Sequence, residues 1–290
     1  MENVFFRFES GIISARNPIV RDVNFSLCRG EKCALIGETG AGKTMIALAV
    51  MGLLPDNVSA DGLKCQLDGV PVDPSVMLGR KMAYIPQNGM DFLNPSLTVG
   101  FHMKESLKRA GKDYGKKDIT DRLAKVGFED PGKILKSYPF ELSGGMAQRV
   151  TIALTLCTDA ELIIADEPTN GLDREAADRM MNHLSELFSS AAMLMITHNI
   201  SDAAACDSVM VLCNGHLMEK GPSFILKNPE SPYTKALLSS LVENGMKPFP
   251  PLRERTECPF SGRCPEYTSS CRSFPKAWKK DNHEWWCRND

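Results

Sequence analysis

The sequence predicts an α/β fold in which buried strands alternate with helices around a phosphate-binding loop. Strand-like and helix-like segments alternate from residue 1 to about residue 226, as in proteins with helices packed on a mostly parallel sheet. Several of the strand-like segments are continuously apolar, which is typical of strands buried on both faces. A glycine-rich stretch at residues 37–44 follows one such strand and opens a helix-like segment. That context is the one in which a glycine-rich match indicates a phosphate loop.

The apolar runs and the turn residues place the individual elements along the chain. Buried strands are expected at residues 32–37, 160–168, 192–197 and 208–215. Helices are expected after Gly42, Gly144 and Asp173. We expect a nucleotide-binding domain over 1–226, an inserted helical subdomain over about 90–157, a Pro-rich linker over 227–257 and a small Cys-rich C-terminal tail over 258–290.

Composition excludes some classes of function. The 290 residues are 43% hydrophobic and 24% charged, with a formal net charge of −2, so there is no electrostatic case for nucleic acid as a partner. The longest apolar run, residues 45–54, is far shorter than the roughly 20 residues that a bilayer requires. The first ten residues do not have the pattern of a signal peptide. We therefore expect a cytoplasmic chain whose membrane role comes through partners.

The phosphate loop reads GETGAGKT. Glycines let backbone N–H groups approach phosphates closely, Lys43 would reach the β- and γ-phosphates, and the Thr44 hydroxyl would bind Mg²⁺. A chance Gly-rich turn would rarely match the whole pattern between a strand and a helix. The nucleotide-binding candidates here are Gly37, Glu38, Thr39, Gly40, Ala41, Gly42, Lys43 and Thr44.

Acidic and polar residues at the ends of other strands complete a hydrolytic set. The apolar stretch LIIADE ends in Asp166, suited to the Mg²⁺ shell, and in Glu167, placed to orient or deprotonate the attacking water. Gln87 follows a short strand and could contact Mg²⁺ and that water. His198 follows another strand and could contact the γ-phosphate. An isolated Gln is more often a surface residue and a lone His is usually structural, so both roles depend on the rest of the set.

A second glycine-containing stretch, ELSGGMAQRVTIA at residues 141–153, also has the form of an anion site. Ser143, Gly144 and Gly145 open a predicted helix, and free N–H groups at a helix start attract phosphate. The apolar face of that helix comprises Met146, Val150, Ala153 and Leu154.

Taken in order, these motifs resemble those of ABC transporter ATPase subunits over essentially residues 1–226. The matching elements are GETGAGKT, Gln87, LSGGM at 142–146, ADEP, GLD at 171–173 and His198. The resemblance implies an ATPase that uses ATP and Mg²⁺ and dimerises head to tail with a second ABC ATPase subunit. It also implies that Ser143, Gly144 and Gly145 cap the partner's nucleotide, with Asp173 at the dimer seam.

Some residues differ from those that are usual at the family's motif positions. Met146 replaces the commoner Gln, and Asn199 follows His198 where Asp is common, but no catalytic group is removed. The aromatic that usually stacks on adenine is not obvious. Phe8 is the candidate, although Phe5 and Phe6 are near and each could be strand core.

Finer resemblance is to the oligopeptide, dipeptide and nickel importer branch. It rests on MGLLPDN, ILKSYPFELSGGMAQR, NPESPYTKALLSSL and CPFSGRCP, at residues 51–57, 134–149, 228–241 and 258–265. The branch implies two integral membrane permease subunits, an external solute-binding protein and a location at the cytoplasmic face of the cell membrane. It implies uptake of peptides or of a nickel chelate, with residues 88–103 forming the groove for a permease helix.

Four of the ten cysteines crowd the tail, at Cys258, Cys264, Cys271 and Cys287. Their gaps of five, six and fifteen residues contain no C-x₂-C pair, which weakens the case for zinc, and a cytosolic location disfavours disulfides. Four thiolates can hold a [4Fe–4S] cluster, and the resemblance favours one; zinc and plain thiols stay open. The alternative function is a soluble ABC-type ATPase in iron–sulfur assembly or another cytosolic process, and membrane association would discriminate.

Overall fold

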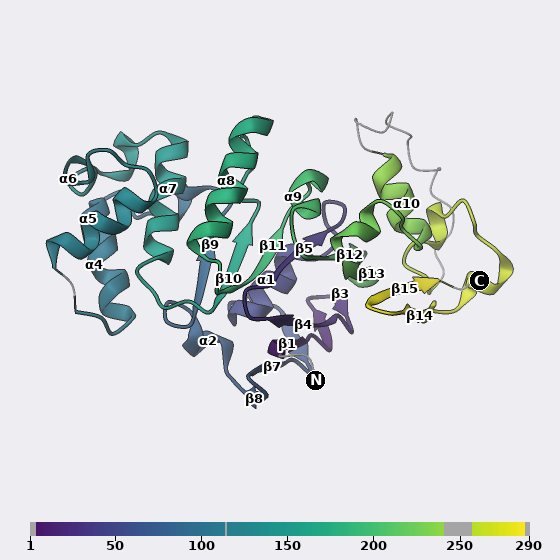
Figure 1. Ribbon diagram of the computed structural model, residues 1–290. Coiled ribbons are helices and arrows are strands. Elements are labelled where there is room, and N and C mark those ends of the chain that lie inside the picture. The colour runs from purple at the N-terminus through teal and green to yellow at the C-terminus, as the bar shows by residue number, and fades with distance from the viewer. Residues whose placement is uncertain (1–3, 114, 241–256, 288–290) are drawn as a thin grey trace. The chain divides into compact units, whose positions relative to one another are not determined.

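The computed structural model describes residues 4–113, 115–240 and 257–287 (Figure 1). The chain divides into two compact units. Unit 1 comprises the described residues up to Val72 and from Met195 onward, and unit 2 runs from Asp73 to Leu194. The phosphate loop and the C-terminal tail therefore belong to unit 1, whereas the LSGGM segment belongs to unit 2.

Unit 1 is rich in strands. Its described elements are β1 (Val4–Glu9), β2 (Ile12–Ser14), β3 (Pro18–Arg21), β4 (Asn24–Cys28), β5 (Lys32–Ile36), α1 (Lys43–Met51), β6 (Ser59–Asp61), β7 (Lys64–Leu67), β8 (Val70–Pro71), α9 (Ile200–Ala204), β12 (Ser208–Cys213), β13 (His216–Pro222), η2 (Ser223–Leu226), α10 (Pro232–Ser239), η4 (Ser261–Arg263), η5 (Ser269–Arg272), β14 (Lys276–Lys280) and β15 (His283–Cys287). The chain enters this unit through the end of β11 (Ala192–Ile196).

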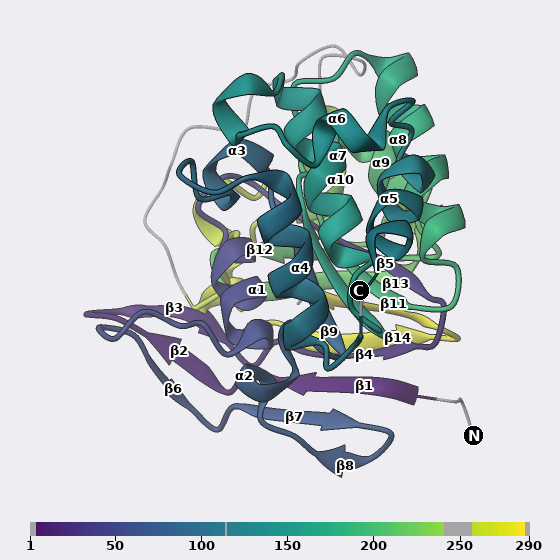
Figure 2. The same cartoon turned by 90° about the vertical axis from the view of Figure 1, so that its left-hand side faces the viewer.

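Unit 1 contains both antiparallel and parallel strand pairs. Strands β4, β1, β7 and β8 lie side by side as antiparallel neighbours, as do β3, β2 and β6 (Figure 2). In the order β14–β15–β13–β12–β5, by contrast, β12 runs parallel to β5. Both of these strands are almost wholly buried, which explains why they read as continuous apolar runs. The parallel pair places the phosphate loop, which follows β5, at a buried strand end.

Unit 2 is mainly helical. Its described elements are α2 (Pro74–Met77), β9 (Met82–Ile85), α3 (Gly89–Phe92), α4 (Val99–Arg109), α5 (Lys116–Lys125), α6 (Pro131–Ile134), η1 (Pro139–Glu141), α7 (Gly144–Thr155), β10 (Leu162–Asp166) and α8 (Arg174–Leu187). Strand β10 runs parallel to β9, with Ile164 beside Tyr84. The carboxyl ends of parallel strands meet at one edge, so the residues after both strands become neighbours.

Helix boundaries in unit 2 follow the capping residues in the sequence. Thr98 caps α4, and the buried residues Val99, Met103 and Leu107 recur at helical spacing along it. Ser143 and Asp173 cap α7 and α8 in the same way. The predicted helix starts after Gly42, Gly144 and Asp173 are confirmed to within one residue.

The C-terminal segments differ from the expected organisation. Residues 232–239, within the predicted linker, form α10, whose Tyr233 is completely buried. Residues 241–256 of that linker lie outside the described residues. The tail strands β14 and β15 continue unit 1 through pairing of β15 with β13 (Figure 1). Burial of an apolar helix and a shared strand edge therefore join residues after 226 to the preceding core.

No helix within the described ranges combines the length and the apolar character that crossing a bilayer would need.

Candidate nucleotide-binding and hydrolytic site

The phosphate loop is tightly packed where it leaves β5. A Cβ built on Gly37 would lie 2.2 Å from the backbone oxygen of Leu212, so a larger residue would push the loop away from β12. Gly42 precedes α1 with a φ of 106°, in the left-handed region that favours glycine. Among the described residues, no side chain caps the start of α1. Its first N–H groups are thus oriented as a helix N-terminus that can receive phosphate.

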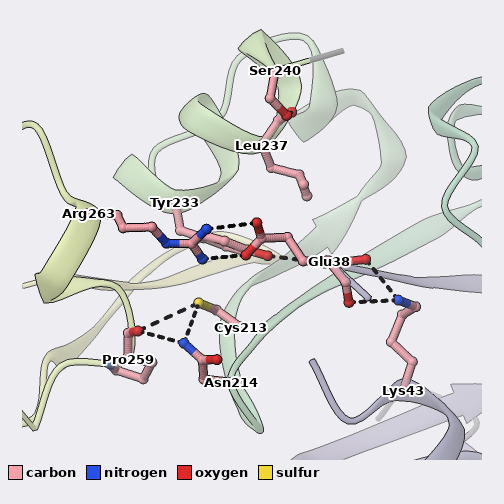
Figure 3. Close-up of polar contacts among 10 residues, drawn as sticks. Glu38, Lys43, Cys213, Asn214, Tyr233, Leu237, Ser240, Pro259 and Arg263 are labelled. Carbon is pink, nitrogen blue, oxygen red and sulfur yellow. Dashed lines mark hydrogen bonds and ion pairs between the residues drawn. The ribbon is translucent and has the colours of Figure 1, made fainter. Parts of the chain in front are cut away.

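Lys43 folds back over this loop. Its ammonium donates to the carbonyl oxygens of Gly37, at 2.8 Å, and of Glu38, at 3.0 Å (Figure 3). The side chain is 9% exposed, whereas the neighbouring Thr44 is exposed. A buried cation held by two carbonyl oxygens can exchange those partners for phosphate oxygens, which carry more charge.

Glu167 occupies a special backbone position directly after β10. Its φ of 45° is in the left-handed region, which a residue with a side chain adopts only when its surroundings impose it. Gln87, the second residue after β9, donates from Nε2 to Oε2 of Glu167 at 2.8 Å. The structure thus brings together two residues that lie eighty positions apart in the sequence.

Tyr84 is a neighbour of the acidic pair that sequence reasoning missed. Its hydroxyl donates to Oδ2 of Asp166 at 3.3 Å. Burial, followed by the charge of Asp166, raises the pKa of Tyr84 above its usual value, so the hydroxyl keeps its proton and can donate. The register of β9 and β10 accounts for this contact. Tyr84 pairs with Ile164, and Asp166 lies two residues further along the same face.

The LSGGM segment forms a capped helix start. Ser143 accepts a hydrogen bond on Oγ from the N–H of Met146 at 3.3 Å. Gly144 and Gly145 are exposed, and a Cβ built on either would have no heavy atom within 4 Å. The N-terminus of α7 is therefore open to a partner molecule.

The same helix is tied to the segment that carries Gln87. The buried side chain of Gln148 donates from Nε2 to the carbonyl oxygen of Pro86 at 3.0 Å. A cavity of ≈ 470 Å³ lies between these parts of unit 2. It is lined by Gln87, Asn88, Gly89, Gly144, Gly145, Gln148, Pro168, Asn170, Gly171, Leu172 and Met180.

The two remaining polar candidates lie at element ends. Asp173 caps α8 by accepting the N–H of Ala176 on Oδ1 at 2.8 Å. His198 follows β11 in unit 1 and is exposed. The next residue, Asn199, caps α9 by accepting from the N–H of Ser201 at 2.9 Å.

Phe8 does not have the surroundings that an adenine-stacking residue needs. Its side chain is 0% exposed, and its ring lies 5.2 Å from that of Phe25. Phe5 and Phe6 are also buried, at 1% and 0% exposed. The alternating burial of β1 turns these rings into the core. This burial contradicts the expectation that Phe8 offers a ring face to adenine.

The four tail cysteines lie around one small cavity with about 20 Å³ accessible to water. Its lining includes Cys258, Cys264, Cys271 and Cys287. Burial raises the pKa of Cys264 to about 12. Within the described residues, no three His, Cys, Asp or Glu side chains converge closely enough to hold a metal ion. The thiol donors thus fit a metal or cluster by chemistry and by location, but not by their present spacing.

Comparison with known protein families gives two matches. The family described as ABC transporter matches residues 20–170. The family described as oligopeptide/dipeptide transporter, C-terminal region, matches residues 218–271. The second match covers α10 and three of the four tail cysteines, Cys258, Cys264 and Cys271.

Alignments with similar proteins cover most of the chain. The dipeptide transport ATP-binding protein DppD of Haemophilus influenzae is 36% identical over 273 residues, covering 86% of this chain and 83% of that protein. DppD of Bacillus subtilis is 34% identical over 309 residues, covering 97% and 90%. A solved structure of an ATP-binding subunit of an ABC transporter superposes with a TM-score of 0.65 at 27% identity, covering 77% of this chain and 92% of that chain.

These matches confirm the family that the order of motifs predicts. The chain belongs to the ABC transporter family and is an ATPase that couples ATP hydrolysis to transport.

Proposed function

We propose that this chain is an ATP-hydrolysing subunit of an importer for dipeptides or other short peptides. The observation that carries the proposal is the pair of family matches on one chain, supported by relatives named for dipeptide transport. The predicted branch also takes up nickel chelates, but neither the matched families nor the relatives above are named for nickel. Nor is any of them named for a soluble role in iron–sulfur assembly.

Within unit 1, the phosphate loop binds the triphosphate of ATP in this proposal. Lys43 exchanges its carbonyl partners for the β- and γ-phosphate oxygens, and His198 contacts the γ-phosphate after β11. The tight packing of the loop at Gly37 and the start of α1, which no described side chain caps, support phosphate binding here, because the N–H groups of a helix N-terminus can donate to an anion. The family resemblance assigns Mg²⁺ to oxygen donors of Thr44 in this unit and of Gln87 and Asp166 in unit 2, and oxygen is the donor that Mg²⁺ prefers. The ion would neutralise charge on the phosphates.

Glu167 is the proposed general base, and Gln87 is its positioning partner. The 2.8 Å hydrogen bond between them supports this assignment because it orients the carboxylate. The carboxylate accepts a proton from the attacking water, and the water oxygen bonds to the γ-phosphorus as the bond to the leaving ADP oxygen breaks.

Ser143, Gly144 and Gly145 are proposed to bind the nucleotide of a second ATPase subunit. The open space around both glycines supports this role, since a phosphate can reach the helix N-terminus without steric hindrance. Asp173 then lies at the seam between the two subunits. ATP binding closes the pair, and hydrolysis releases it.

The assembly extends to the membrane in this proposal. Two integral membrane permeases hold the chain at the cytoplasmic face, and an external solute-binding protein delivers the solute to them. The segment 88–103, which overlaps the start of the helical subdomain over about 90–157, would form the groove that receives a permease helix. Exposed apolar side chains at Phe92 and Phe101 support a docking role for that segment.

The Cys-rich tail over 258–290 is proposed to carry a [4Fe–4S] cluster, with zinc as the alternative. Four thiols around one cavity support it. Iron, acid-labile sulfide and zinc would be measured in chain purified anaerobically, with all four cysteines changed to Ser as the control. Absence of all three from the native chain would exclude both forms.

One purification tests the function. The tagged chain would be isolated anaerobically from native membranes, and copurifying proteins would be identified by mass spectrometry. We expect two permeases, a second ATPase and an external binding protein, whose affinity for dipeptides, longer peptides and nickel chelates is then measured. Exclusively soluble partners, with the chain absent from membranes, would contradict the importer.

A further inference from the structure

The phosphate loop contains an acidic residue where a triphosphate has to bind. Glu38 follows Gly37, and its carbonyl oxygen is one of the two acceptors of Lys43. A carboxylate in this position repels phosphate unless a cation neutralises it. The family motif accounts for the glycines, Lys43 and Thr44, but the motif itself supplies no partner for this carboxylate.

The C-terminal tail supplies that cation. Arg263, in η4, donates from Nη1 to Oε1 of Glu38 at 2.9 Å and from Nη2 to the other carboxylate oxygen (Figure 3). The two side chains are 21% and 29% exposed. A two-bonded arginine–carboxylate pair fixes orientation as well as charge. Because the pair is partly buried, salt screens its attraction less than it would screen that of a surface pair.

The backbone of Glu38 is held from the same side. Its N–H donates to the hydroxyl oxygen of Tyr233 in α10 at 3.3 Å. Tyr233 is completely buried, and its ring meets that of Phe260 edge-on at 5.2 Å. The C-terminal region therefore holds this one loop residue by both its side chain and its backbone.

The turn that carries Arg263 is itself anchored. Asn214, between β12 and β13, donates from Nδ2 to the carbonyl oxygen of Pro259 at 2.9 Å (Figure 3). The Ser261 hydroxyl donates to the carbonyl oxygen of Cys258 at 2.8 Å. Arg263 thus projects from a fixed turn, which allows it to act as a positioning residue and not merely as a mobile counter-ion.

We propose that the C-terminal tail positions and neutralises the phosphate loop, with Arg263 as the positioning residue that sets nucleotide affinity through Glu38. The inference rests on the proposed role of this loop in binding ATP. The anchor also shares Tyr233, Phe260 and Ser261 with the lining of the cysteine cavity. The tail therefore contributes directly to nucleotide binding by its own chain.

The test measures binding of a slowly hydrolysed ATP analogue with Mg²⁺ to the purified full chain. We expect Arg263→Gln to weaken affinity about three- to tenfold, because an unpaired carboxylate then faces the phosphates. The loss should shrink at high salt, which screens that repulsion. Arg263→Lys should lose less, since the charge remains without the two-bonded geometry.

A double variant separates neutralisation from folding. Glu38→Gln combined with Arg263→Gln should restore affinity to within about twofold of the native chain, because the repulsion is gone. Arg272→Gln, at another exposed tail arginine, is the matched control and should bind as the native chain does. Circular dichroism and thermal unfolding would confirm that each variant is folded.

The outcomes distinguish this inference from the proposed function. Failure of the native chain to bind the analogue would overturn both. Native binding with unchanged affinity in Arg263→Gln would overturn the inference alone. Weakened binding that Glu38→Gln does not rescue would also overturn it, since Arg263 would then act through the fold of the tail.

Discussion

At the residue scale, hydrolysis in the proposed site depends on the backbone position of Glu167. The left-handed φ and the hydrogen bond from Gln87 together orient one carboxylate at the end of β10. Such a conformation costs of order 1–3 kcal/mol and persists where the surroundings impose it. We interpret the cost as the consequence of turning the carboxylate toward the reacting water.

Glu167→Gln should bind ATP and fail to hydrolyse it. The amide keeps the shape of the side chain but cannot accept the proton, so turnover should fall by about 10²- to 10⁴-fold. ATP hydrolysis by the assembled transporter and ATP retention by the variant are the measurements. Glu161→Gln, at the opposite end of β10, is the control and should leave turnover unchanged. Normal turnover in Glu167→Gln would show that the base lies elsewhere.

His216 should make the stability of unit 1 depend on pH. Burial, followed by the charge of Arg21, lowers the pKa of His216 from 6.5 to about 4. Between these values the unfolded chain binds a proton that the folded chain does not, so stability falls as the pH falls through this window. After discounting for partial exposure, we expect a loss of about 1 kcal/mol between pH 7 and pH 5.

Urea unfolding at both pH values would measure that loss. The comparison is with His216→Gln, which removes the titrating ring but keeps a polar side chain. The native chain should lose more stability on acidification than the variant. Equal losses in the two proteins would show that His216 has an ordinary pKa.

At the element scale, glycines in unit 2 have opposite surroundings. A Cβ on Gly89 would lie 2.7 Å from backbone atoms of Ala147 and Gln148, where α3 packs against α7. A Cβ on Gly145, in the first turn of α7, would meet no heavy atom within 4 Å. The first glycine is thus required by packing within the chain, and the second is not.

Gly89→Ala should therefore destabilise the isolated chain by about 1–3 kcal/mol, because backbone must move to accept the methyl group. Gly145→Ala should leave stability unchanged or higher, since Ala favours a helix over Gly by up to about 1 kcal/mol. Thermal unfolding measures both effects.

Gly145→Ala should nevertheless reduce ATP-dependent association with the second ATPase subunit, because the methyl group occupies the surface that the partner's phosphate approaches. Analytical ultracentrifugation with and without ATP would measure it. Native-like association would contradict the proposed role of this helix start. Gly89→Ala is unsuitable as a probe of association because its fold is itself perturbed.

At the scale of the whole molecule, one buried carboxylate joins the tail to the core of unit 1. Glu219 in β13 is 0% exposed. Its oxygens accept the N–H groups of Glu230, at 2.7 Å, and Ser231, at 3.3 Å, and contact Nε2 of His283 in β15 at 2.7 Å. One side chain thus holds two other segments, residues 230–231 and β15, to β13.

Glu219→Ala should destabilise the chain by about 2–4 kcal/mol, because the buried N–H of Ser231 and the partly buried N–H of Glu230 lose their acceptor. Glu284→Ala, in the neighbouring tail strand, is the matched control. Glu284 is partly buried, but it pairs with two lysines, Lys220 and Lys279, of which Lys279 is 67% exposed. Water can solvate both ammonium groups when the carboxylate is removed, so its loss should cost under about 1 kcal/mol. Urea unfolding of both variants tests the contrast, and equal costs would show that Glu219 does not join these segments.

The sequence by itself determined the family, the main strands and helices, and the motifs that carry the chemistry. These features are local, since apolar periodicity, capping residues and glycine spacing act over a few neighbouring positions. Gln87 and Glu167 were identified in this way, although only the parallel pairing of β9 with β10 brings them together.

The tertiary structure alone decided features that depend on long-range packing. It placed Phe8 in the core, paired Tyr84 with Asp166, and made α10 part of unit 1. It also brought Arg263 to Glu38, 225 residues away along the chain. A local sequence pattern does not indicate which distant charged residue neutralises a given carboxylate, because that pairing depends on how strands and turns pack in three dimensions.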